Sequence, residues 1–112
     1  MKFMAIFGTR PEAIKIVPVI KKLRESGYQV IICVTAQQRD MLDQSLGFFE
    51  IIPDYDLNLM VDCQDLFHIT IKALEGLKKI LQKERPDVVL VQGDTSTAFT
   101  ASLAAFYLQI PI

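Results

Sequence analysis

The sequence has little of what several large functional classes require. Two cysteines and one histidine occur in 112 residues, and Cys33 and Cys63 are thirty positions apart without a CxxC pair. This argues against a zinc centre or a redox disulfide, so we expect no metal site, and two free thiols fit a reducing cytoplasm. Twelve basic and thirteen acidic residues give a formal charge of −1, which argues against binding to nucleic acid through bulk charge.

Long hydrophobic runs are absent too. No apolar stretch approaches the roughly 20 residues of a membrane span, and no signal-peptide pattern follows Met1. We therefore expect a cytoplasmic protein with no membrane partner. The glycine-rich patterns GxGxxG and GxxxxGK[ST] do not occur, so neither familiar phosphate-binding motif identifies a ligand. No repeat or Gly/Ser linker divides the chain, and its length suits one domain.

What the sequence does contain is an alternation of buried strands and amphipathic helices. Apolar runs predict strands at 3–7, 30–34 and 88–91, a short edge strand at 54–57, and the start of another at 109–112. Helical spacing predicts helices at about 11–25, 39–46, 62–84 and 95–107. This alternation predicts an α/β fold: a Rossmann-like parallel sheet with helices on both faces. The expected order across the sheet is edge, second, first, fourth and fifth strand.

The long third helix has two candidate residues at its start. We expect Asp62 to be its N-cap and Asp65 to lie in its first turn. Its inner face is predicted to carry Leu66, Ile69, Ala73, Leu77 and Ile80. His68 falls among the polar positions, so a structural or solvated role is expected for it.

In the predicted strand order, the first and fourth strands are neighbours, so residues 8–15 and 93–96 should face one another at their carboxyl ends. The connections of these two strands leave in opposite directions, and ligands bind at such points in parallel sheets. In the run FGTRPE, Gly8 permits a sharp turn and Pro11 suits the first position of a helix. Arg10 and Lys15 then stand beside a helix N-terminus with free N–H groups, a combination that favours an anion. The alternative is an ordinary strand-to-helix turn with two solvated cations.

Asp94 also allows two interpretations. It follows a strand end and Gly93, so it could be the N-cap of the last helix. It could instead be a carboxylate that faces a pocket shared with Arg10 and Lys15. Beside a bound phosphate, such a group can position a sugar hydroxyl or assist proton transfer.

Five runs of the sequence carry a resemblance to a known family: FGTRPEAIK, VTAQQRDMLDQ, PDYDLNLM, RPDVVLVQGDTSTAF and SLAAFYLQIPI. In this order they resemble the amino-terminal part of bacterial UDP-N-acetylglucosamine 2-epimerases of the non-hydrolysing type. The resemblance implies a glycosyltransferase-B type protein with two Rossmann-like domains and an active site between them. Residues 1–112 would be a truncated amino-terminal domain without the carboxy-terminal one, because the sequence stops before the family's HVEAGLR run.

The resemblance also implies a function. Members interconvert UDP-N-acetylglucosamine and UDP-N-acetylmannosamine for cell-surface polysaccharides. They eliminate UDP to give a 2-acetamidoglucal and add it back with the opposite configuration at carbon 2. No cofactor is implied, the ligands are UDP-N-acetylglucosamine and UDP, and the full-length protein is expected to be a homodimer. Arg10 and Lys15 match the residues that contact the nucleotide sugar, and Asp94 matches a catalytic carboxylate.

The sequence departs from the family pattern in places. Gln38 stands where members usually have histidine. Gln37 matches a glutamine that binds an activating second UDP-N-acetylglucosamine, but Cys63 aligns with an arginine of that activator site, so weak activation is expected. Because later active-site residues are missing, residues 1–112 alone are expected to be inactive. Two alternatives stay open: a hydrolysing epimerase that releases free N-acetylmannosamine, and a non-catalytic structural or dimerising domain.

Overall fold

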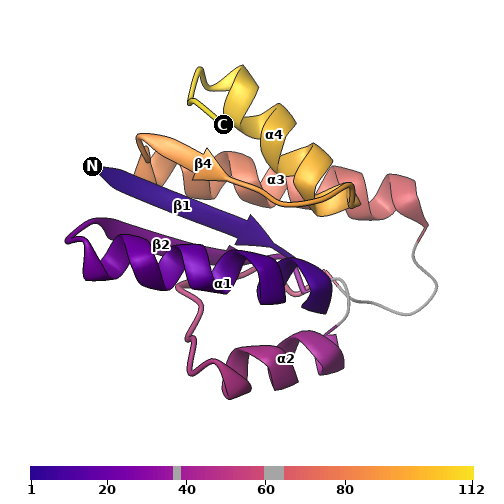
Figure 1. The fold of residues 1–112 in the computed structure, drawn as a ribbon. Coiled ribbons are helices and arrows are strands. Elements are labelled where there is room, and N and C mark those ends of the chain that lie inside the picture. The colour runs from indigo at the N-terminus through magenta and orange to yellow at the C-terminus, as the bar shows by residue number, and fades with distance from the viewer. Residues whose placement is uncertain (37–38, 60–64) are drawn as a thin grey trace.

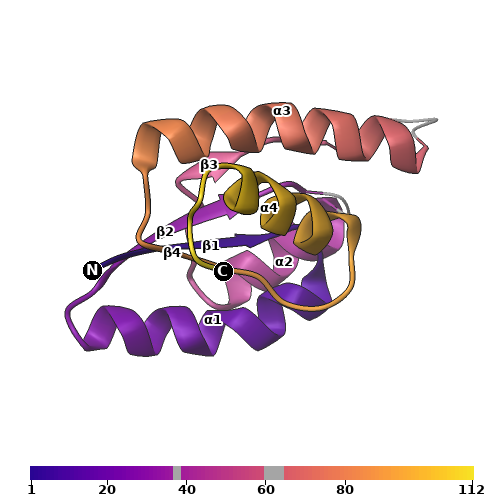
Figure 2. The same ribbon diagram turned by 90° about the horizontal axis from the view of Figure 1, so that it is seen from above.

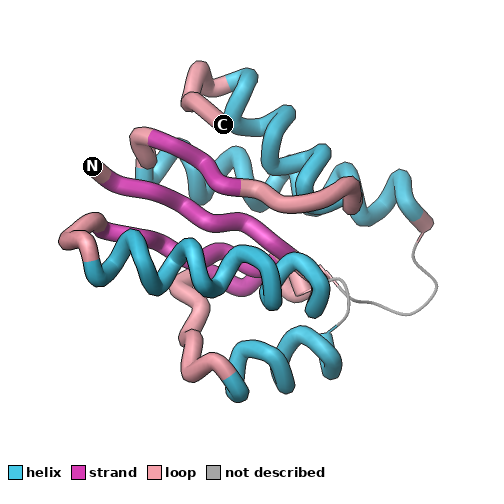
Figure 3. Tube along the Cα trace, viewed as in Figure 1, coloured by secondary structure: helices cyan, strands magenta, loops and turns pink. Residues whose placement is uncertain are grey.

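The computed structural model describes residues 1–36, 39–59 and 65–112. Within them, strands and helices alternate along the chain (Figures 1 and 3). The strands are β1 (Lys2–Phe7), β2 (Gln29–Val34), β3 (Tyr55–Asp56) and β4 (Val88–Leu90). The helices are α1 (Arg10–Glu25), α2 (Arg39–Phe48), α3 (Leu66–Glu84) and α4 (Ser96–Tyr107). The four predicted helices and the first four predicted strands are therefore confirmed, with shifts at most ends.

The sheet has the order β3-β2-β1-β4, and each pairing is parallel. Helices α1 and α2 cover one face, and α3 and α4 cover the other (Figures 1 and 2). The predicted order of the first four strands is confirmed. Residues 109–112 do not form a strand, but the Val89 N–H donates to the Pro111 carbonyl at 2.8 Å. The chain after α4 therefore returns to the outer side of β4, where the fifth strand was expected.

Alternate side chains of β1 enter two separate cores. Met4 and Ile6 belong to the core under α3 and α4, whereas Ala5 and Phe7 belong to the core under α1 and α2. Successive residues of a strand point to opposite faces, so a strand that is apolar at every position needs cover on both sides. The inner face of α1 carries the buried apolar residues Ala13, Ile16, Val17 and Ile20.

Helix α4 packs through small side chains. Its buried residues are Thr97, Ala98, Thr100, Ala101, Ala104 and Ala105. Because alanine has no atoms beyond Cβ, this face lets the α4 backbone approach its neighbours closely.

The start of α3 differs from the prediction. Asp65 is the N-cap, since its carboxylate accepts the His68 N–H at 2.8 Å and the helix begins at Leu66. Asp62 lies outside the described residues. Leu66, expected on the inner face, is 67% exposed because the first turn of α3 extends past the strand ends (Figure 2). The local pattern could not separate two aspartates that both suit a helix cap.

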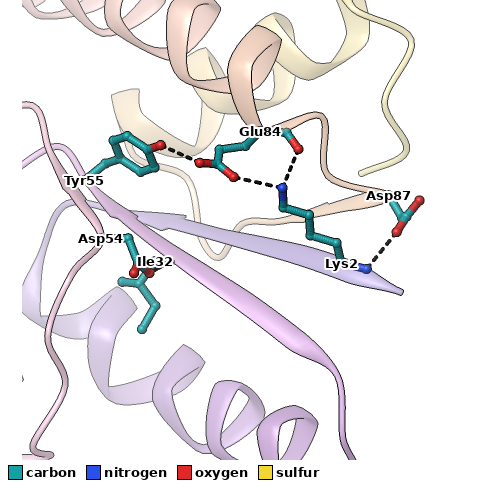
Figure 4. Close-up of polar contacts among 6 residues, drawn as sticks. All are labelled: Lys2, Ile32, Asp54, Tyr55, Glu84 and Asp87. Carbon is teal, nitrogen blue, oxygen red and sulfur yellow. Dashed lines mark hydrogen bonds and ion pairs between the residues drawn. The ribbon is translucent and has the colours of Figure 1, made fainter.

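Glu84, the last residue of α3, joins the helix to two strands (Figure 4). Lys2 Nζ of β1 lies 2.8 Å from Glu84 Oε2 and donates to the Glu84 carbonyl at 2.6 Å. The Tyr55 hydroxyl of β3 donates to Glu84 Oε1 at 2.5 Å. The hydrogen bonds from Lys2 and then Tyr55 lower the pKa of Glu84, and the bond to Glu84 raises the pKa of Tyr55. This contact fixes the end of α3 against the sheet.

Two small residues, Cys33 and Gly76, fit closely packed positions under and within α3. Cys33 is fully buried, as expected of a core residue, and burial followed by the charges of Asp56 and Asp54 raises the pKa of its thiol to about 12. Such a thiol is a poor nucleophile at neutral pH. At Gly76, in the middle of α3, an added Cβ would lie only 2.7 Å from Leu57 Cδ2. The absence of a side chain there makes room for Leu57.

Leu77→Ala should lower the free energy of unfolding by about 2–5 kcal/mol, because Leu77 is fully buried in the core under α3. The same substitution at Leu66, on the same helix but largely exposed, should change it by less than about 0.5 kcal/mol. Urea titrations followed by circular dichroism measure both values. Equal losses would contradict the inner face assigned to α3.

Glu84→Gln should lower stability most at neutral pH. The pKa of Glu84 is lowered by folding, so its stabilising contribution is complete above the unfolded glutamate value of about 4.3 and is lost as pH falls through the folded value. The difference in unfolding free energy between variant and wild type should therefore narrow in acid. Glu75→Gln, whose exposed carboxylate lies 3.8 Å from Lys72, is the control and should show little difference at any pH. A Glu84 effect independent of pH would argue against this account.

Candidate functional site

The turns that follow β1 and β4 meet at the carboxyl edge of the sheet. These strands are parallel neighbours, so their ends lie side by side. A hydrogen bond joins the two turns: Thr95 Oγ1, at the start of α4, donates to Glu12 Oε1, in the first turn of α1, at 2.5 Å. The predicted proximity of residues 8–15 and 93–96 is confirmed.

Glu12 is the centre of this junction, and it is only 2% exposed. Its Oε2 accepts the Gly8 N–H at 2.9 Å, and it accepts the Thr9 N–H and the Thr9 hydroxyl, each at 2.8 Å. Sequence reasoning left the N–H groups at this helix start for an external anion. The amides of Gly8 and Thr9, just before α1, are instead bound by the chain's own carboxylate, and the anion site beside Arg10 and Lys15 stays a prediction.

A second buried hydrogen bond ties the end of β2 to α4. Thr35 Oγ1 and Thr97 Oγ1 lie 2.7 Å apart, and both residues are buried. The Thr35 N–H also donates to the Phe7 carbonyl of β1 at 3.0 Å. The ends of β1, β2 and β4 are therefore joined by hydroxyl and carboxylate side chains beyond the sheet itself.

Arg10 and Lys15 occupy different flanks of α1, and both are exposed. Arg10, the first residue of the helix, borders a groove of about 370 Å³ between α1 and α2. The other residues of this groove are Ile14, Gln44, Ser45, Phe48 and Phe49. Lys15 follows Glu12 by three residues, so it lies on the flank of α1 from which Glu12 reaches Thr95.

Asp94 is exposed in the turn after β4, and it is not the cap of α4. The cap is Thr95, whose Oγ1 accepts the Ala98 N–H at 3.2 Å. The capping interpretation of Asp94 is wrong, since the helix begins one residue later than expected. Gly93 turns the chain before Asp94 with a φ of 87°, in the left-handed region that favours glycine. In the described part of the chain, no hydrogen bond or ion pair engages the Asp94 carboxylate.

Three positions from the sequence analysis lie outside the described residues: Gln37, Gln38 and Cys63. Their roles stay predictions. Within residues 1–36, 39–59 and 65–112, no cluster of histidine, cysteine or acidic residues could hold a metal ion. No helix in the same ranges is both long and apolar enough to cross a membrane. His68 is exposed, as expected for a solvated position.

Glu12 is the residue that sequence reasoning missed. The sequence did contain a signal for the contact between Glu12 and Thr9. Thr9-x-x-Glu12 matches the capping box, in which a glutamate accepts the N-cap amide. No local pattern indicates the contact between Glu12 and Thr95, since the two residues are 83 positions apart in the sequence. The buried pair of Thr35 and Thr97, 62 positions apart, was missed for the same reason.

This edge of the sheet suits acid–base chemistry on an anionic ligand. Two exposed cations, Arg10 and Lys15, can make charge-assisted contacts to phosphate. An exposed carboxylate, Asp94, stands on the neighbouring turn and can accept or donate a proton. The buried hydrogen bonds of Glu12 hold the two turns together beneath these groups.

Comparison with known families gives one match that covers most of the chain. The family model described as UDP-N-acetylglucosamine 2-epimerase matches residues 21–112. The UDP-N-acetylglucosamine 2-epimerase of Escherichia coli (strain K12) is 55% identical over 113 residues, which cover 100% of this chain and 30% of that protein. The chain therefore spans about 30% of the length of the curated relatives that it matches.

Solved structures of similar proteins superpose closely. The crystal structure of UDP-GlcNAc 2-epimerase from Neisseria meningitidis bound to UDP-GlcNAc gives a TM-score of 0.90 at 53% identity, covering 99% of this chain and 31% of that one. The crystal structure of Methanocaldococcus jannaschii UDP-GlcNAc 2-epimerase in complex with UDP-GlcNAc and UDP gives a TM-score of 0.92 at 37% identity. This match covers 98% of this chain and 31% of that one. The similarity thus extends over nearly all of this chain and under a third of each structure.

Substitutions at positions 94 and 95 should affect stability differently. Thr95→Ala should lower the free energy of unfolding by at least about 1 kcal/mol, because it removes the cap of α4 and a donor to buried Glu12. Asp94→Ala should change it by less than about 0.5 kcal/mol. Urea titrations give both values. The reverse ranking would restore Asp94 as the cap.

Proposed function

Since the chain belongs to the UDP-N-acetylglucosamine 2-epimerase family, we propose that it forms the amino-terminal domain of an enzyme that interconverts UDP-N-acetylglucosamine and UDP-N-acetylmannosamine. The observation that carries the proposal is the junction of the two turns: Thr95, next to Asp94, donates to Glu12, which lies between Arg10 and Lys15 in the sequence of α1. Relatives whose structures superpose on this chain are described with UDP-GlcNAc and UDP bound.

In the proposed reaction, a base removes the proton from carbon 2 of the sugar while the bond from carbon 1 to UDP breaks. The electron pair forms the double bond of a 2-acetamidoglucal, and UDP departs. UDP then adds back to carbon 1, and a proton returns to carbon 2 from the opposite face. These steps consume no oxidant or reductant, so no redox cofactor is required.

We assign the residues of this chain by their chemistry. Arg10 and Lys15 bind the diphosphate, whose negative charge increases as UDP leaves and is stabilised by fixed cations. Asp94 takes part in acid–base catalysis, because its carboxylate is exposed and is not used as a helix cap. In this assignment, Glu12 contacts no substrate, since it is buried beneath the two turns.

We further propose that the complete enzyme has a second Rossmann-like domain in a glycosyltransferase-B arrangement. The length of the relatives supports this, since the chain covers 30% of the E. coli protein. A second domain is needed to close the active site and exclude water from the glucal intermediate, so residues 1–112 alone should bind UDP without turnover.

The enzyme is proposed to act in the cytoplasm as a homodimer in cell-surface polysaccharide synthesis. Gln37 is proposed to contact an activating second nucleotide sugar.

A structural or dimerising domain is the second candidate function. One observation favours it: Phe99 and Phe106, on the outer side of α4, are 60% and 70% exposed. Exposed aromatic residues of this size are typical of protein contacts. This candidate predicts self-association without any affinity for UDP.

The proposal is tested with a chimaera in which residues 1–112 replace the matching 113 residues of the E. coli relative. Incubated with UDP-N-acetylglucosamine, the chimaera should form UDP-N-acetylmannosamine, detected by proton NMR of the nucleotide sugars. Release of free N-acetylmannosamine would favour a hydrolysing enzyme, and no turnover by a folded chimaera would contradict the proposal. Calorimetric titration of UDP into the 112-residue chain tests binding directly, and no binding there would favour the structural domain.

Asp94→Asn should reduce turnover of the chimaera by at least about 100-fold, because an amide of the same size cannot exchange the proton. UDP should bind at least as tightly, since one negative charge near Arg10 and Lys15 is gone. Steady-state rates and UDP titrations measure the two effects. Asp65→Asn is the control, because asparagine caps α3 about as well as aspartate. Undiminished turnover would remove Asp94 from the catalytic assignment.

A further inference from the structure

The buried carboxylate of Glu12 contacts the neighbours of both proposed functional side chains. Thr9 directly precedes Arg10, and Thr95 directly follows Asp94. We propose that Glu12 is a positioning residue, which fixes the turn of Arg10 against the turn of Asp94 so that both reach the same nucleotide sugar. The inference rests on the proposed function and adds a role for a residue that touches no substrate.

The two carboxylate oxygens of Glu12 serve different turns. Oε2 accepts three hydrogen bonds, from the Gly8 N–H, the Thr9 N–H and the Thr9 hydroxyl. The two backbone amides among these groups can only donate. Oε1 accepts from Thr95, whose hydroxyl oxygen accepts the Ala98 N–H in return. One side chain therefore links the start of α1 to the start of α4 through an unbroken set of hydrogen bonds.

This link is needed because the sheet does not extend to the two turns. β1 and β4 pair at three positions, and the last joins Ala5 to Leu90. Arg10 and Asp94 lie four or more residues beyond that pair, where ladder hydrogen bonds between these strands no longer set their separation. A shift of about 1 Å between reacting groups can cost about 100-fold in rate. The contacts of Glu12 therefore act where precise spacing matters and backbone pairing has ended.

A purely structural role for Glu12 makes a different prediction. In that case its loss lowers the melting temperature, but the protein that stays folded retains its turnover number. A positioning role lowers kcat in folded protein, while KM changes less because the cations that bind UDP are still present. The two roles are therefore separated by kinetics at a temperature well below unfolding.

The experiment uses two pairs of variants in the chimaera described above. Glu12→Ala removes the carboxylate, whereas Glu12→Gln keeps its shape, one acceptor oxygen and an amide that can donate to Thr95. Thr95→Val removes the linking hydroxyl, and Thr95→Ser retains it. With each variant shown to be folded by circular dichroism, Glu12→Ala and Thr95→Val should lower kcat by about 100-fold. Glu12→Gln and Thr95→Ser should restore kcat to within about 10-fold of the parent.

Leu81→Ala is the control for lost stability, because Leu81 is fully buried near the last turn of α3 and makes no contact with Glu12. It should lower the melting temperature and leave kcat unchanged. Normal kcat in folded Glu12→Ala, or in Thr95→Val if Glu12→Ala does not fold, overturns the inference alone. A parent chimaera without turnover overturns the proposed function and this inference together.

Discussion

The parallel pairing of β1 with β2 on one side and with β4 on the other determines where the rest of the molecule lies. Parallel neighbours cannot be joined by a tight turn, so each connection must pass over a face of the sheet and carries a helix. The chain leaves β1 toward β2 and later returns beside β1 as β4, so the connections diverge at the carboxyl ends of these two strands. The candidate site lies there because of strand order, and no single motif produces it.

At that edge, a carboxylate of the protein itself accepts backbone N–H groups that could otherwise bind an anionic ligand. A carboxylate at a helix N-terminus is favoured by the helix dipole, and Glu12 takes up the amides of Gly8 and Thr9. Any external phosphate must then depend more on the cationic side chains of Arg10 and Lys15. Because both are exposed, such binding should weaken as ionic strength rises.

Much of the fold follows from local sequence, because each buried strand is a short apolar run and the helices keep a clear inner face. The start of α3 did not follow, since only three-dimensional context selects Asp65 as the cap. At the site, sequence could bring Arg10 and Asp94 to one edge of the sheet. It could not assign the cap of α4, because Asp94 and Thr95 are adjacent and both suit that role. The bond between Glu12 and Thr95 joins distant positions, which no local pattern encodes.

The close approach of Leu57 to Gly76 has a consequence for how this sequence can vary. Glycine in the middle of a helix costs about 1 kcal/mol of stability relative to alanine. Helix propensity alone would therefore favour alanine at position 76. Here any replacement brings a carbon within 2.7 Å of Leu57 as it now stands. Positions 57 and 76 are therefore coupled: a larger residue at 76 becomes acceptable when 57 becomes smaller or moves. Substitutions at these two positions should therefore be non-additive in their effect on the free energy of unfolding.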